Sequence, residues 1–284
     1  MGLYNSLNFI NYLNMDFNFI FHLGDIGYDL NSYFGMVGDI FLSKMEFIIS
    51  KIPYMTIAGN HESFANFSEY KNRFSMPNYN NNVNFFYTIE KPPIKMININ
   101  TEIFYFESVK FLVNKQIDYL ILNLNNTDRK KFPYLIVTGH RPIYCSNKNY
   151  DDCVFWQRDI LRNKFENLLL KYNVTIYISA HEHSYERICP IYNGSCQNTS
   201  SNNKYYLSNL NYTIHITTGA AGCIEGKDNF KKIKPEWSIK RNINKGFGIL
   251  KTNTNSLLWN EYIVKNEKNI LIDNFTIIND YYNL

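Results

Sequence analysis

Four apolar, strand-like runs in this chain end in a glycine or alanine that polar and imidazole side chains follow at once. The runs cover residues 17–23, 53–58, 134–138 and 174–179. Helical periodicity over residues 37–49, 116–124 and 159–172 separates them, and further strands are expected over 212–217, 248–252, 257–264 and 269–277. Alternating strands and helices predict an α/β fold. Because ligands bind beyond the carboxyl ends of strands in such sheets, the polar blocks are expected to converge there.

The four blocks are short and chemically distinctive. They are Gly-Asp-Ile-Gly-Tyr at 24–28, Gly-Asn-His-Glu at 59–62, Thr-Gly-His-Arg-Pro at 138–142 and Ala-His-Glu-His at 180–183. Together they hold a carboxylate, a phenol, an amide and imidazoles, a mixed ligand set that suits iron, zinc or manganese. Four of the six histidines in the chain fall in these blocks, which predicts a metal site. His22 and His215 lie within strands and are expected to be structural.

Each block also has a role of its own. The Asp25 carboxylate has two oxygens and can bridge two cations, and a phenolate from Tyr28 would favour Fe(III). Asn60 offers an amide oxygen to a divalent metal, although an asparagine after a glycine turn also begins helices. In extended structure His181 and His183 point to the same side and can reach one site. Taken alone, the block at 24–28 is more typical of a surface turn than of a metal site.

Charge and hydropathy exclude two classes of partner. The net charge of +4 and pI of about 8.6 are too mild for a nucleic-acid-binding protein, and no basic stripe occurs. No stretch of about 18 apolar residues is present, so no membrane span is expected.

The cysteines and sequons indicate an oxidising compartment. Cys145 and Cys153 flank one short polar loop and Cys189 and Cys196 flank another, so two local disulfides and an unpaired Cys223 are the simplest arrangement. Reduced thiols in a cytosolic protein are the alternative. Glycosylation sequons occur at Asn66, Asn125, Asn173, Asn193, Asn198, Asn211 and Asn274. An acidic vacuole or the extracellular space is therefore expected as the location, and the chain is expected to be a secreted glycoprotein.

The blocks, taken with several other segments, resemble the purple acid phosphatases of the metallophosphoesterase superfamily. The additional segments are Phe-Ser-Met-Pro at 74–77, Asn-Thr-Glu at 100–102, residues 139–146, residues 180–187 and Thr-Gly-Ala-Ala-Gly-Cys at 218–223. The match runs over essentially the whole chain and is closest to the animal and protist long-chain branch. The resemblance implies one catalytic domain over residues 1–284, without the family's N-terminal β-sandwich. The implied fold is an α/β/β/α sandwich of two mixed sheets with flanking helices.

The resemblance also implies roles for the site residues. Asp25 would bridge the metals, Tyr28 and His183 would bind Fe(III), and the remaining ligands would bind a divalent Fe, Zn or Mn. Those remaining ligands are Asn60, His140 and His181. His61 would contact the phosphate or protonate the leaving group, and Glu62 and Arg141 would support the site. The implied reaction is hydrolysis of small phosphate monoesters by in-line attack of a metal-bound hydroxide. The oligomeric state is not implied.

One motif of the family is missing. An Asp-x-Gly block normally precedes the bridging aspartate by roughly 25 to 30 residues and supplies another Fe(III) ligand. Met1-Gly2 stands at that position, so the sequence is expected to begin inside this motif, with the first core strand upstream. The same explanation accounts for the lack of a visible signal peptide and for a chance myristoylation pattern at residues 1–6. The alternatives are a weakly active or inactive binding module, or a related metallophosphodiesterase.

Overall fold

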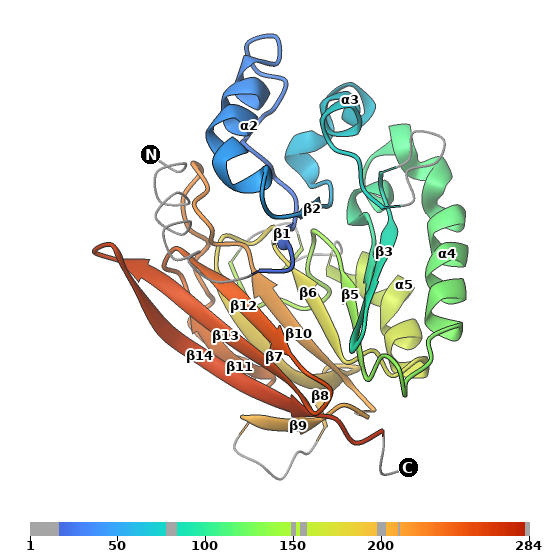
Figure 1. Cartoon of the computed structure of the whole chain (residues 1–284). Coiled ribbons are helices and arrows are strands. Elements are labelled where there is room, and N and C mark those ends of the chain that lie inside the picture. The colour runs from blue at the N-terminus through green and yellow to red at the C-terminus, as the bar shows by residue number, and fades with distance from the viewer. Residues whose placement is uncertain are drawn as a thin grey trace.

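The structure is a computed structural model and describes residues 17–77, 84–148, 152–153, 158–197, 203–209 and 211–281. Within these residues the strands form three sheets (Figure 1). The largest has eight strands, the second has four, and the third is the parallel pair β1 (Ile20–His22) and β2 (Tyr54–Thr56). The expectation about Met1-Gly2 lies outside the described residues.

The eight-stranded sheet is mixed and occupies the centre of the molecule. Its strand order is β11-β7-β10-β6-β5-β4-β3, with β8 paired to β7. Strands β4, β5, β6 and β10 run parallel to one another, and the other pairings are antiparallel. The bounds are β3 Tyr87–Lys91, β4 Ile94–Asn98, β5 Tyr134–Thr138, β6 Ile176–Ser179, β7 Tyr185–Tyr192, β8 Ser195–Cys196, β10 Thr213–Thr218 and β11 Ser238–Asn242.

Both faces of this sheet are buried, which explains the continuous apolar runs of its central strands. In β5, Leu135 and Val137 pack on one face with helices α4 (Val113–Asn125) and α5 (Arg158–Lys171). Tyr134 and Ile136 point to the opposite face. This alternation follows the two-residue period of a strand. Figure 1 shows α4 and α5 on one side of the eight-stranded sheet and β12–β14 on the other.

The four-stranded sheet covers that second face. It comprises β12 (Gly246–Thr252), β13 (Ser256–Lys265), β14 (Lys268–Ile278) and β9 (Tyr205–Leu207), in the order β12-β13-β14-β9. Trp259 and Phe275 on its inner face share one buried cluster with Ile136 and Ile214 of the large sheet. The predicted α/β fold with two mixed sheets packed face to face is therefore confirmed.

The β1–β2 pair carries two of the polar blocks. Helices α2 (Met36–Ile49) and α3 (Phe64–Arg73) and the 3₁₀ turn η1 (Asn60–Glu62) belong to the same region, at the upper end of the molecule in Figure 1. Two more 3₁₀ turns, η2 (Thr101–Phe104) and η3 (Glu107–Leu112), lead into α4. The blocks follow β1, β2, β5 and β6, so all four leave the carboxyl end of a parallel strand.

Most helices and strands lie where the sequence predicts them. The elements that were not predicted are short or contain polar residues. The β3–β4 hairpin, β7, β9, β11 and α3 have no counterpart among the expected elements. The short strand β8 also has no counterpart among the expected elements. The two expected disulfides, Cys145–Cys153 and Cys189–Cys196, are formed, and Cys223 is free. Among the described helices, none has the length and hydropathy to cross a bilayer.

Candidate metal centre

Four predicted metal ligands converge at the carboxyl ends of β1, β2, β5 and β6. The Asn60 side-chain oxygen lies 3.1 Å from His140 Nε2 and 3.0 Å from His181 Nδ1. The two imidazole nitrogens are themselves 3.2 Å apart. Asp25 Oδ2 lies 3.3 Å from His140 Nε2. Donor atoms of Asp25, His140 and His181 all lie within 4.8 Å of one another.

The hydrogen-bond partners on the far sides of the rings show which nitrogens face inward as lone pairs. His140 Nδ1 donates to the carbonyl oxygen of Leu23 at 2.6 Å, so its Nε2 is the basic nitrogen. His181 Nε2 lies 3.2 Å from Asp152 Oδ2 and 3.2 Å from Arg141 Nη1, and with the ring proton on Nε2, toward the carboxylate, Nδ1 is the basic nitrogen. In these tautomers the lone pairs of two imidazoles, an amide oxygen and a carboxylate face one another. This arrangement fits a cation.

The pKa of His140 also indicates that the site favours a positive charge. Burial lowers it, but the adjacent Asp25 carboxylate more than compensates and raises the pKa of His140 to about 9. Burial also opposes ionisation of Asp25, yet the imidazoles around it hold the Asp25 pKa well below its usual range. The site therefore takes up positive charge, as a proton or as a metal ion that displaces it.

Tyr28 and His183 form a second group beside Asp25. The Tyr28 hydroxyl lies 2.8 Å from His183 Nε2. Donor atoms of His183, Cys223 and Glu225 also lie within 4.8 Å of one another. Burial and the Asp25 charge raise the pKa of Tyr28, so this phenol loses its proton only when a strong cation replaces it. Tyr28 and His183 could hold a second metal ion on this side of Asp25.

Backbone geometry brings the blocks this close. Asp25 has a left-handed conformation with φ of 56°, and Gly24 before it has φ of 89°. The buried Glu62 carboxylate accepts hydrogen bonds from the amides of Asp25, Ile26 and Gly59 at 2.8, 2.6 and 2.7 Å. A Cβ atom on Gly59 would lie 2.3 Å from Asp25 Oδ1. Glycine at 59 thus allows the second block to approach the first.

His61 stands next to this group with two carboxylates around it. Its Nδ1 lies 2.7 Å from Asp29 Oδ1 and its Nε2 lies 3.4 Å from Glu225 Oε1. Its ring centroid is 4.5 Å from that of Tyr28. Burial lowers the pKa of His61, but Asp25, Asp29 and Glu225 together raise it above its ordinary value. An imidazole in this setting can carry a proton at the edge of the site.

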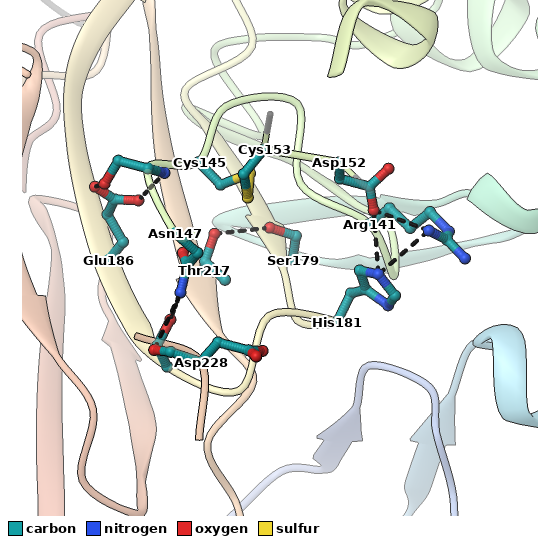
Figure 2. The surroundings of a disulfide bond; sticks show 12 residues. Arg141, Cys145, Asn147, Asp152, Cys153, Ser179, His181, Glu186, Thr217 and Asp228 are labelled. Atoms are coloured by element: carbon teal, nitrogen blue, oxygen red, sulfur yellow. Dashed lines mark hydrogen bonds and ion pairs between the residues drawn. A yellow bond between two sulfur atoms is a disulfide. The ribbon is translucent and has the colours of Figure 1, made fainter. Parts of the chain in front are cut away.

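Arg141 contacts the Nε2 side of the His181 ring, with Nη1 3.2 Å from that nitrogen, and joins a buried ionic network. Its Nε donates to both oxygens of Glu102 at 3.0 Å, and its Nη1 donates to Asp152 Oδ2 at 2.9 Å. The guanidinium also lies 4.3 Å from the ring centroid of Tyr105. Figure 2 shows Arg141 and Asp152 beside the imidazole of His181.

All nine predicted site residues therefore lie in one region. Five further residues that contact them were missed by sequence reasoning: Asp29, Asp152, Cys223, Glu225 and Asp228. Position beside Tyr28 and Cys153 could have pointed to Asp29 and Asp152, but no local pattern marks Glu225 or Asp228. His22 and His215 lie outside the group: His22 hydrogen-bonds Tyr54, and His215 lies between the rings of Tyr144 and Tyr177.

Comparison with known proteins shows which family this chain resembles. Residues 2–185 match the family described as Calcineurin-like phosphoesterase, and residues 212–274 match the one described as Iron/zinc purple acid phosphatase-like protein C. The human protein named acid phosphatase type 7 is 39% identical over 231 residues, which cover 78% of this chain and 52% of the human protein. The zebrafish protein of the same name is 34% identical over 279 residues, covering 93% of this chain and 62% of that protein.

Plant relatives match as well. The solved structure of purple acid phosphatase PPD1 from yellow lupin seeds superimposes with a TM-score of 0.84 at 30% identity, covering 99% of this chain and 49% of the lupin chain. An Arabidopsis relative named probable inactive purple acid phosphatase 27 is 30% identical over 277 residues, covering 92% of this chain and 43% of that protein. The chain thus spans about half the length of these relatives. With both family matches and these relatives, the chain belongs to the purple acid phosphatases of the calcineurin-like phosphoesterase family.

Proposed function

We propose that this chain binds two metal ions and hydrolyses small phosphate monoesters as an acid phosphatase. The observation that carries the proposal is the convergence of ligand atoms from Asp25, Asn60, His140 and His181, each 3.0–3.3 Å from a neighbour in the group. Such a site is stable only with positive charge inside it. Two bound metal ions would bind the phosphate and activate a water molecule for in-line attack.

The ligand chemistry supports a division of the two ions. The phenol of Tyr28 with His183 and one Asp25 oxygen is suited to Fe(III), since a phenolate is a hard, anionic donor. The amide of Asn60 with two imidazoles and the other Asp25 oxygen is suited to a divalent Fe, Zn or Mn ion. Asp25 would then bridge the two ions, and its low pKa favours the carboxylate form that bridging needs.

His61 is our candidate for the proton donor to the leaving group. A hydrogen bond from Nδ1 to Asp29 would fix the ring, and Nε2 would carry the transferable proton. The raised pKa of His61 favours the protonated form that such a donor needs. Glu62 would keep the first two blocks together through its three amide contacts, and Arg141 would act through Asp152 and Glu102.

The secretory route is part of the proposal. Two disulfides close short loops, which is typical of proteins from oxidising compartments. Among the sequons, Asn66, Asn125, Asn193 and Asn211 have exposed side chains that a glycan could reach. We therefore expect a glycoprotein of an acidic vacuole or of the extracellular space.

A second candidate is a phosphate-binding module without turnover. The observation in its favour is that several of the plant relatives are named probable inactive purple acid phosphatases. Metal content and turnover together separate the two candidates.

The test is hydrolysis of p-nitrophenyl phosphate by the metal-loaded chain, with metal content measured on the same sample. Asn60→Ala and His140→Ala should each lower turnover at least about 100-fold with loss of about one metal ion per chain, because each removes a ligand. Lys115→Ala, an exposed change on α4, is the matched control and should alter neither quantity. Two bound metal ions without any turnover would favour the binding module, and no bound metal would refute both.

A further inference from the structure

We propose that Asp152 is a positioning residue for His181, and that the Cys145–Cys153 disulfide holds Asp152 in place. The affinity of the site for a divalent ion then depends on the redox state of that disulfide. The inference rests on the proposed function in one respect, namely that His181 binds a metal.

Two of the contacts of Asp152 are with predicted site residues. Its Oδ2 lies 3.2 Å from His181 Nε2 and 2.9 Å from Arg141 Nη1, while its Oδ1 accepts a hydrogen bond from the Tyr105 hydroxyl at 3.0 Å. The side chain is 2% exposed, so water does not screen these contacts. Figure 2 shows the carboxylate directed at the imidazole and the guanidinium.

Asp152 is the acceptor beside His181 Nε2, since the Arg141 guanidinium, also 3.2 Å from this nitrogen, can only donate. When Nε2–H donates to Asp152, the lone pair of Nδ1 is directed at Asn60 Oδ1, 3.0 Å away. Without Asp152 the ring could carry its proton on Nδ1 or rotate, and either change removes a ligand. Carboxylates that orient a ligating histidine in this way commonly contribute 10- to 100-fold in metal affinity.

The backbone of Asp152 depends on the neighbouring disulfide. Neither Asp152 nor Cys153 belongs to a helix or a strand. Cys153 is joined to Cys145, with the two Cα atoms 5.2 Å apart, and its carbonyl oxygen accepts a hydrogen bond from Lys231 Nζ at 2.9 Å. Cys145 lies shortly after β5, on the segment that also carries His140 and Arg141. The disulfide thus ties Asp152 to the segment that holds its partner Arg141.

The disulfide can be reached from outside. A cavity of about 230 Å³ is lined by Cys145, Cys153 and Asp152, among others. A small dithiol could reduce the bond there. The reductant gives two electrons and two protons, the two cysteines become thiols, and the dithiol closes to its own disulfide. Asp152 would then lose its tether while the His181 ring remains on its own strand end.

The first test measures affinity and not turnover. Zn²⁺ binding to the purified chain is followed by competition with a chromogenic chelator, for the wild type, Asp152→Ala and Asp152→Asn. We expect about 10- to 100-fold weaker binding for Asp152→Ala, and a smaller loss for Asp152→Asn because the amide keeps an acceptor for His181 Nε2–H. Asp118→Asn, an exposed change on α4, is the control. Far-UV circular dichroism identifies any variant that fails to fold.

The second test uses the other disulfide as a matched control. The Cys145→Ser/Cys153→Ser variant should bind Zn²⁺ about 10-fold more weakly, whereas Cys189→Ser/Cys196→Ser should match the wild type. The two bonds span 8 and 7 residues, so they constrain similar lengths of chain.

The outcomes separate this inference from the proposed function. Wild-type affinity in folded Asp152→Ala overturns the role of Asp152 and leaves the metal site intact. Equal losses in the two disulfide variants overturn the specific tether. A wild type that binds no Zn²⁺ at all overturns both the inference and the proposed function.

Discussion

His140 Nδ1 donates a hydrogen bond to the carbonyl oxygen of Leu23 at 2.6 Å, across 117 residues of sequence. His140 is fully buried and follows β5 of the large sheet, whereas Leu23 follows β1 of the two-stranded sheet. This one contact joins two sheets and also fixes the tautomer of a candidate ligand. This hydrogen bond therefore links correct packing of the two sheets to the correct tautomer of a candidate metal ligand.

Glu62→Ala should destabilise the protein by about 3 kcal/mol or more. The change leaves three buried amides, those of Asp25, Ile26 and Gly59, without their acceptor, and each unsatisfied donor costs about 1–3 kcal/mol. The free energy of unfolding in urea measures the effect. Glu107→Ala removes an exposed carboxylate that pairs with Lys110 and should stay within about 0.5 kcal/mol of the wild type. Equal stabilities of the two variants would refute the role given to Glu62.

Glu102→Gln should cost about 3–5 kcal/mol of stability, because it leaves the buried Arg141 guanidinium with less compensating charge. Glu102→Leu combined with Arg141→Met should cost less than the sum of the two single changes, since the double variant removes both charges. Urea unfolding of the wild type, the single variants Glu102→Leu and Arg141→Met, and the double variant gives the coupling energy. The more exposed pair Arg162–Asp159 is the comparison and should couple by about 0–1 kcal/mol. Additive effects at Glu102 and Arg141 would contradict the prediction.

Tyr28→Phe should abolish the visible absorption band expected of the iron-loaded chain. The variant keeps a ring beside His61, with centroids at 4.5 Å in the wild type, but loses the hydroxyl beside His183. Without a phenolate, charge transfer to Fe(III) is impossible, while Zn²⁺ binding at Asn60, His140 and His181 should be retained. An absorption spectrum with iron and zinc contents tests this. Tyr33→Phe, at an exposed position, should leave the band unchanged, and persistence of the band in Tyr28→Phe would remove Tyr28 from the ligand set.

His215→Phe should make stability less dependent on pH in the acid range. Burial lowers the pKa of His215 to about 3, against 6.5 in the unfolded chain. Below pH 6.5 the unfolded state takes up a proton that the folded state refuses, so the stability present above pH 6.5 is lost as pH falls toward 3. The loss at pH 5 is about 2 kcal/mol for this group. Phenylalanine keeps a ring between Tyr144 and Tyr177 and does not titrate.

Urea unfolding at pH 7 and at pH 5 measures this difference for the wild type and the variant. Some pH dependence should remain in the variant, because burial also lowers the pKa of His22 to about 4. An unchanged difference between the two pH values would show that His215 is not neutral in the folded protein.

Much of the fold follows from local pattern. Several elements lie within a few residues of their predicted bounds, namely the helices α2, α4 and α5 and the strands β5, β6 and β10. The helical and the strand periodicity both result from burial of one or two faces of the element, so each can be recognised in the sequence. The β3–β4 hairpin was missed because two prolines separate its strands and its residues alternate weakly. The strand β7 was missed because its Glu186 and Arg187 interrupt the apolar run, although both are buried with polar partners.

Which chemical groups follow the strand ends can be predicted from the amino-acid sequence, because the polar blocks are local and each follows an apolar run. The tertiary structure decided how those groups meet. Only in the folded chain does Asp152 reach His181, Asp228 reach His183, and Leu23 fix the proton of His140. These contacts join loops that are 29, 45 and 117 residues apart, and no periodicity encodes which loop faces which. The sequence contains the candidate ligands, and the packing of the sheets brings each of them next to the residues that orient it.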